Sequence, residues 1–136
     1  MPRDEKLEHL KRVPLFARMG HRELERLGQL ADEIEVGLDQ VLTEQGRIGH
    51  EFFFVIDGHL VVLDGNRPIA NLGPGDFFGE IALIAHTPRT ATVTTAGNVD
   101  LLVITAQSFK TLLEHQPAIA SKVLAALAER IAPESL

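Results

Sequence analysis

The chain of 136 residues contains no cysteine, no tryptophan and no tyrosine. Without cysteine it forms no disulfide bond and has no thiol chemistry, which is typical of a cytoplasmic protein. Its longest uninterrupted apolar run, residues 123–128, is far shorter than the about 20 residues that a membrane-spanning helix needs. The N-terminal sequence MPRDEKLEHL is charged and lacks the apolar centre of a secretory signal. These absences predict a cytoplasmic protein with no membrane span.

Basic residues are in the minority. The 13 lysines and arginines stand against 19 aspartates and glutamates, which gives a formal net charge of −6. Proteins that bind a nucleic-acid backbone carry a basic surface, so we expect no direct nucleic-acid binding. A small anion is still a plausible ligand, because a local site can be positive on a negative protein. The length and the apolar content of 45% suit one globular domain, residues 1–136.

Helical patterns are expected at both ends of the chain. Near the N-terminus they cover residues 3–12 and a second segment from residue 21, where leucine recurs every third residue. Near the C-terminus they cover residues 106–115 and then continue from Pro117 to about Ile131. Pro117 is compatible with this assignment because proline is tolerated in the first turn of a helix.

The middle of the chain changes to short β-rich runs separated by glycine. These runs are residues 34–36, 41–44, 51–56, 59–64, 68–72, 91–95 and 100–105. Asp57-Gly58 and Asp64-Gly65-Asn66 are typical hairpin signals between them. Phe53 should point away from its neighbours Phe52 and Phe54, because side chains alternate along a strand. The pattern predicts a mainly β fold with flanking helices, an antiparallel β-roll or jelly roll.

The most informative segment is GPGDFFGEIALIAHTPRTATV, residues 73–93. At Gly79-Glu80 a loop opens into a short apolar helix, where free backbone N–H groups favour an anion. Arg89 follows ten residues after Gly79, directly after a proline that stiffens the turn. A helix start and a guanidinium suit a phosphate, and a carboxylate suits the hydroxyl groups of an attached sugar. The segment therefore predicts a pocket for a ribose phosphate.

This segment closely resembles the phosphate-binding cassette of cyclic nucleotide-binding domains. Residues 78–84 (FGEIALI) and 88–93 (PRTATV) reproduce that cassette's two halves, separated by three loop residues. Residues 13–16 (VPLF) resemble the family's helical entry, and residues 53–58 (FFVIDG) resemble its strand-and-turn core. The similarity covers roughly residues 7–131 and looks bacterial, like the sensor domains of catabolite activator-type regulators.

The resemblance implies a single domain in three parts. Residues 1–33 would be N-terminal helices, residues 34–105 the β-roll with the cassette at 77–93, and residues 106–131 the C-terminal helices. The family's C-terminal helix closes as a lid over the nucleotide base, and bacterial members often dimerise through it. The implied partners are therefore a second copy of the chain or an unidentified effector protein.

The resemblance also implies a reversible cyclic nucleotide sensor that changes conformation on binding and is not an enzyme. Glu80 would accept from the ribose 2′-hydroxyl, and Arg89 would pair with the exocyclic phosphate oxygens. The implied ligand-binding residues are Phe78, Gly79, Glu80, Ile81, Ala82, Arg89, Thr90, Ala91 and Arg130. The ligand is expected to be cAMP, with cGMP as the alternative. Two of these residues have structural alternatives: Thr90 as an ordinary strand-start residue, and Arg130 as a cation that favours its helix terminus.

Two other interpretations remain. One is an interaction domain that keeps the fold and binds no nucleotide, against which Glu80 and Arg89 argue. The other is a cupin-like metalloenzyme, which would carry a His-x-His pair on a barrel strand. The six histidines are scattered and form no such pair: His9, His21, His50, His59, His86 and His115. The GxSxG, HExxH and GxxxxGK[ST] motifs are also absent, so we expect no catalytic residue, no metal and no cofactor.

Overall fold

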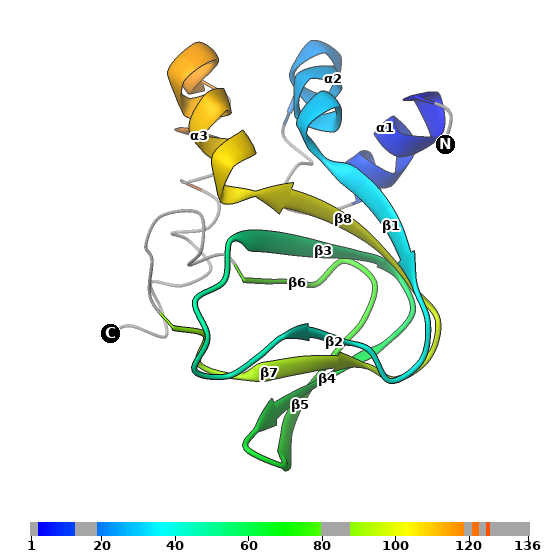
Figure 1. Ribbon diagram of the computed structural model, residues 1–136. Helices are drawn as coiled ribbons and strands as arrows, with labels where there is room; N and C mark the ends of the chain where they lie inside the picture. Colours follow the sequence, from blue (N-terminus) through cyan, green and yellow to red (C-terminus); the bar gives the residue numbers. More distant parts are fainter. Residues whose placement is uncertain (1–2, 13–18, 80–87, 119–120, 123–124, 126–136) are drawn as a thin grey trace.

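Figure 1 shows the computed structural model, which describes residues 3–12, 19–79, 88–118, 121–122 and 125. The elements are helices α1 (Arg3–Arg12) and α2 (His21–Leu30), strands β1 (Asp32–Val36), β2 (Val41–Thr43), β3 (Glu51–Asp57), β4 (Leu60–Asp64), β5 (Arg67–Leu72), β6 (Phe77–Phe78), β7 (Thr92–Thr95) and β8 (Val99–Thr105), and helix α3 (Ala106–His115). Residues 117–118, 121–122 and 125 are also helical. The predicted order of helices, strands and helices is confirmed for the described residues, whereas the short helix predicted after Gly79 and most of the helix predicted from Pro117 to Ile131 lie outside them.

The strands form two four-stranded antiparallel sheets, in the orders β1-β8-β3-β6 and β2-β7-β4-β5. In Figure 1 the two sheets face each other, and helices α1, α2 and α3 gather on the outer side of the first sheet. This arrangement confirms the predicted antiparallel β-roll with flanking helices. Among the described residues, no helix combines the length and apolarity that crossing a membrane requires.

Strand β3 is buried on both faces, which explains its three consecutive phenylalanines. Phe52 and Phe54 are fully buried in a cluster with Leu27 of α2, between the helices and the first sheet. Phe53 points the other way, into a second cluster with Leu60 between the two sheets. The predicted alternation is confirmed. Each ring contributes about 1.5–3 kcal/mol of hydrophobic stabilisation, so β3 is held firmly in place.

The two predicted hairpins have different outcomes. Asp64-Gly65-Asn66 does join the paired strands β4 and β5, with Asp64 opposite Arg67 and Gly65 at φ +63°. The hairpin predicted at Asp57-Gly58 is wrong, because β3 pairs with β6 and β8 whereas β4 pairs with β5 and β7. Gly58 instead carries the chain from one sheet to the other at φ +93°, where an added Cβ would lie 2.5 Å from the Asn98 carbonyl oxygen.

Strand β6 is missing from the predicted strands, because two residues are too short to show alternation. It follows a tight turn at residues 73–76, where the Asp76 N–H donates to the Gly73 carbonyl over 3.0 Å. The register then places Phe78 opposite Phe53 of β3. As a result, the loop after β6 starts beside the first residues of β3, where the candidate site lies.

Candidate functional site

The backbone of Arg89 is fixed by the segment at residues 46–48. The Arg89 N–H donates to the Arg47 carbonyl over 2.7 Å, and the Gly46 N–H donates to the Arg89 carbonyl over 2.9 Å. Pro88 forms an isolated antiparallel bridge with Ile48. The backbone of Pro88 and Arg89 is therefore paired with residues 46–48, although no regular strand forms there.

The guanidinium of Arg89 is oriented by the first residue of β3. Its Nη2 donates to the Glu51 carbonyl oxygen over 2.7 Å, and the side chain is half-buried. A backbone carbonyl at the end of a well-packed strand is a rigid acceptor. A guanidinium carries five N–H donors in a planar fork, a geometry that suits bidentate pairing to a carboxylate or a phosphate.

Two glycines make the space that the guanidinium occupies. A Cβ added to Gly49 would overlap Nε of Arg89. A Cβ added to Gly79 would lie 2.7 Å from Nη1 of Arg89 and 2.6 Å from the Glu51 carbonyl oxygen. Gly79 also has φ +82°, a conformation that other residues rarely adopt. The lack of a side chain at Gly79 therefore lets the Arg89 guanidinium and the Glu51 carbonyl come close together.

Gly49 and the Glu51 carbonyl were not among the predicted site residues. Gly49 stands in a loop sequence, GRIGH, which shows only that the chain turns there. The Glu51 contact is made by a backbone oxygen, so the identity of its side chain carries no signal. The signal that was available is the position of Gly49, two residues before the first residue of the strongly apolar strand β3.

The other predicted residues fall into three groups. Phe78 is buried, and its ring stacks on Phe53 with 4.8 Å between the centroids, so it belongs to the core beneath the site. Thr90 is exposed next to Arg89, and the carbonyl of half-buried Ala91 accepts from the Thr43 hydroxyl over 3.4 Å. Glu80, Ile81, Ala82 and Arg130 lie outside the described residues.

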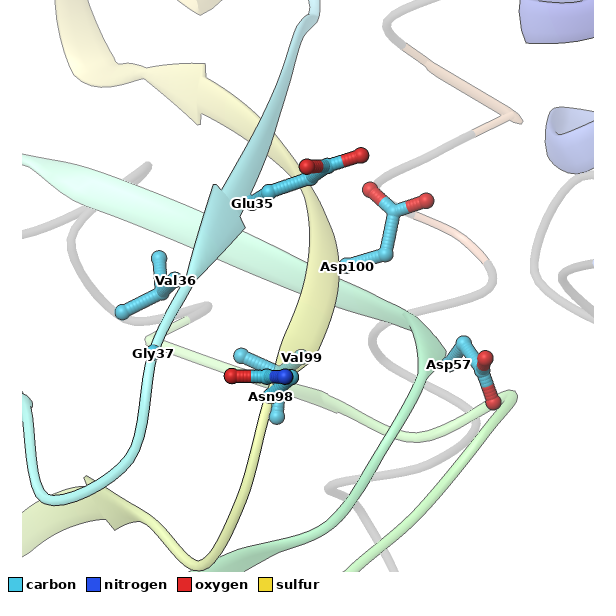
Figure 2. A pocket seen from close by; sticks show the side chains of 7 residues that line it. All are labelled: Glu35, Val36, Gly37, Asp57, Asn98, Val99 and Asp100. Atoms are coloured by element: carbon cyan, nitrogen blue, oxygen red, sulfur yellow. The ribbon is translucent and has the colours of Figure 1, made fainter.

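A hollow of about 450 Å³ has the opposite chemistry (Figure 2). Its lining is Glu35, Val36, Gly37, Asp57, Asn98, Val99 and Asp100. Burial raises the pKa of the Asp100 carboxyl from 3.8 to about 6, and the neighbouring Glu33 carboxylate is the next cause. A surface with three carboxylates repels phosphate, so this hollow does not compete with Arg89 for an anionic ligand.

Comparison with known proteins shows the family to which the chain belongs. The chain matches the cyclic nucleotide-binding domain family over residues 33–116. It is 36% identical over 118 residues to a cyclic nucleotide-gated potassium channel of Rhizobium etli, covering 87% of this chain and 33% of the channel. The chain thus spans about a third of that relative's length.

Two solved structures share the fold. One is the N-terminal domain of a transcriptional regulator from Streptomyces coelicolor, with a TM-score of 0.80, 26% identity, and coverage of 93% of this chain and 92% of that one. The other is the regulatory domain of Toxoplasma gondii PKA with cAMP, with a TM-score of 0.76 and 25% identity. The match covers 93% of this chain and 50% of that one. The family match extends over more than half of the chain and includes Gly49, Gly79 and Arg89. The chain therefore belongs to the cyclic nucleotide-binding domain family, a family of regulatory ligand-binding domains.

Proposed function

We propose that this chain binds cAMP as a regulatory ligand, and that Arg89 receives the cyclic phosphate. The observation that carries the proposal is the guanidinium held between Gly49 and Gly79 by the Glu51 carbonyl. Gly49 and Gly79 leave space for the Arg89 guanidinium, and the Glu51 carbonyl orients it. Such pre-organisation suits a small anionic ligand, since little side-chain entropy remains to be lost on binding.

The remaining contacts follow the order of the cassette. Glu80 accepts from the ribose 2′-hydroxyl, and the backbone N–H groups of residues 79–82 complete the anion cradle beside Arg89. Thr90, which is exposed and follows Arg89 in the chain, adds a hydroxyl contact to the same phosphate. Arg130 contacts the base. The roles of Glu80 and Arg130 rest on the family resemblance, because both residues lie outside the described part of the chain.

The output of binding is a change in the C-terminal helices rather than a reaction. A ligand shifts a conformational equilibrium only by contacting one state better than the other. Lys122 already links this region to α2, with its Nζ 2.7 Å from Oε1 of Glu23. Closure over the base would change this contact and transmit binding to a second copy of the chain or to an effector protein. On this proposal the chain has no catalytic residue.

The proposal is tested by calorimetric titration of the chain with cAMP and, separately, with cGMP. We expect cAMP to bind more tightly than cGMP. Arg89→Ala should weaken cAMP binding about ten- to a hundredfold, since a charge-assisted contact contributes roughly 1.5–3 kcal/mol. Arg89→Lys should recover only part of this loss, because an ammonium cannot reproduce the planar fork.

Arg67→Ala is the matched control, because Arg67 is an exposed arginine on the β4–β5 hairpin of the same roll. It should leave the affinity for cAMP unchanged. If neither nucleotide binds to the parent chain, the alternative of a ligand-free interaction domain is correct. If Arg89→Ala binds as tightly as the parent, the assignment of the phosphate to Arg89 is wrong.

A further inference from the structure

The β1–β8–β3 register brings carboxylates directly opposite one another. Asp100 of β8 pairs with Glu35 of β1 on one side and with Asp57 of β3 on the other. Figure 2 shows the side chains of Glu35 and Asp100 projecting from the same side of the sheet. Like charges in directly opposed strand positions are destabilising. This end of the sheet therefore carries an electrostatic cost that a cation would offset.

A histidine from α1 and a further carboxylate from β1 lie beside Asp100 and form a cluster with it, His9, Glu33 and Asp100. Nδ1 of His9 lies 2.9 Å from Oε1 of Glu33, and the Glu33 side chain is only 8% exposed. One ligand atom each from His9, Glu33 and Asp100 all lie within 4.8 Å of one another. One imidazole nitrogen and two carboxylates thus converge from the three elements α1, β1 and β8.

One oxygen of this cluster has no partner among the described residues. Oδ1 of Asp100 is buried and makes no hydrogen bond within the part of the chain that the structure describes. A buried carboxylate oxygen left without a partner is costly, and its cost is removed by a bound cation. This oxygen is an observation separate from the register, and a bound cation would give it a partner.

We propose that His9, Glu33 and Asp100 bind a divalent transition-metal ion of the Zn²⁺ class. A neutral imidazole with carboxylates suits such ions, whereas Ca²⁺ and Mg²⁺ prefer oxygen ligands alone. Ligand atoms about 2 Å from a tetrahedral zinc stand about 3.3 Å apart, so side-chain rotations suffice to close the cluster. The three protein ligands leave a fourth position for water.

This site differs from the cupin-like metal centre considered in the sequence analysis. A cupin-like centre needs a His-x-His pair, whereas these three ligands come from separate elements and contain one histidine. The bound ion would tie α1 to β1 and β8, and an ion that binds only the folded chain raises its stability. The proposal does not depend on nucleotide binding, because Arg89 and its two glycines share no residue with the cluster.

The test is a titration of the full chain with zinc chloride, without nucleotide and in a buffer that does not chelate metals. Calorimetry should show one ion per chain, and the melting temperature should rise by several degrees. His9→Ala and Asp100→Asn should each lower the affinity at least about tenfold, since even groups that only orient metal ligands contribute 10- to 100-fold. Asp100→Asn keeps the shape of the side chain and removes a repelling charge, so it tests the site even if His9→Ala fails to fold.

His21→Ala provides the control. His21 and Glu25 of α2 are four residues apart, with Nε2 2.8 Å from Oε1, so this histidine–carboxylate pair offers a metal two ligands outside the cluster. This variant should keep the parent's zinc affinity and its rise in melting temperature. The proposal is overturned if the parent shows no binding, if either cluster variant binds as tightly as the parent, or if His21→Ala loses the effect.

Discussion

The two ends of the β3–β8 strand pair carry opposite chemistry. At one end, where Glu51 pairs with Thr105, the Glu51 carbonyl holds the Arg89 guanidinium. At the other end, where Asp57 pairs with Asp100, carboxylates gather around a hollow. Glu51 and Asp57 are the two ends of the seven-residue strand β3, which places them about 20 Å apart at 3.3 Å per residue step. One rigid ladder therefore keeps a cationic and an anionic site apart.

The two ends are also built differently. The Arg89 end consists of backbone, with Gly49 and Gly79 giving space and a carbonyl giving orientation. The acidic end consists of side chains, with His9, Glu33 and Asp100 supplied by three elements. A site made from backbone is sensitive to the addition of any Cβ. A site made from side chains is sensitive to the loss of a charge.

The largest effect is expected from filling the space beside the guanidinium. In Gly49→Ala the new Cβ and Nε of Arg89 cannot occupy the same position, so the guanidinium must leave the Glu51 carbonyl. We expect the affinity for cAMP, measured by calorimetry, to fall roughly a hundredfold, near the upper end of one charge-assisted contact.

Gly97→Ala is the control for this change, because an added Cβ there meets nothing within 4 Å and the residue does not have a positive φ. It should leave cAMP binding unchanged. Tight binding by Gly49→Ala would show that the space around Arg89 does not matter for the ligand.

The next effect concerns a carboxylate expected at the cationic end. If Glu80 accepts from the ribose hydroxyl, Glu80→Ala should weaken cAMP binding about tenfold or more, by roughly 1.5–3 kcal/mol. Binding of the 2′-deoxy analogue should change only slightly, because that ligand lacks the donor. Titration of both ligands into both proteins gives the difference. Equal losses for the two ligands would mean that Glu80 supports the loop rather than the sugar.

A smaller effect is expected from neutralising the acidic end. The pKa of Asp100 is raised in the folded chain from 3.8 to about 6, so the folded chain binds the proton more tightly than the unfolded chain. The stability that this group contributes is fully present below about pH 4 and is lost as the pH rises through about 6. Asp100→Asn should therefore raise the free energy of unfolding at pH 7 by about 1 kcal/mol, less than the full linkage value because the carboxyl is only partly buried.

Urea unfolding of both proteins at pH 4 and pH 7, with EDTA present, measures this difference. The advantage of Asp100→Asn should be present at pH 7 and nearly absent at pH 4. A variant that is less stable than the parent at pH 7 would contradict the raised pKa.

The smallest effect is expected at a surface pair outside both ends. Lys122 and the Gly20 N–H lower the pKa of the Glu23 carboxyl, so the stability they provide is present above its ordinary value of 4.5 and lost as the pH falls. Because the pair is exposed, Lys122→Ala should reduce the free energy of unfolding at pH 7 by only a few tenths of a kcal/mol. Urea unfolding of the parent and of Lys122→Ala at 0.1 and 1 M salt measures this reduction. A reduction in the free energy of unfolding above about 1 kcal/mol would contradict a purely surface role.

The sequence predicts the cationic end better than the acidic end for a physical reason. Gly79 and Arg89 stand ten residues apart in one motif, so their order is visible in the chain. His9 and Glu33 are 24 residues apart, and Asp100 comes from the far end of the roll, so only the fold brings them together. A cluster of that kind leaves no local pattern to read.

The same distinction between local and distant residues explains which predictions about the fold were right and which were wrong. The alternation of Phe52, Phe53 and Phe54 follows from strand geometry, and it was predictable. The turn at Asp57-Gly58 has the residues of a hairpin, yet its strands belong to different sheets. Local sequence specifies that the chain turns, whereas the partner of each strand depends on residues far away. Strand pairing was therefore the part of the fold that the sequence left open.

The central claim, that Arg89 receives the phosphate of cAMP, is tested most directly by a crystal structure of the chain with cAMP. The account predicts phosphate oxygens within about 3 Å of the Arg89 guanidinium nitrogens, with Gly49 and Gly79 packed against that side chain. A cyclic nucleotide bound elsewhere on the roll, with no phosphate oxygen near the Arg89 guanidinium, would contradict it.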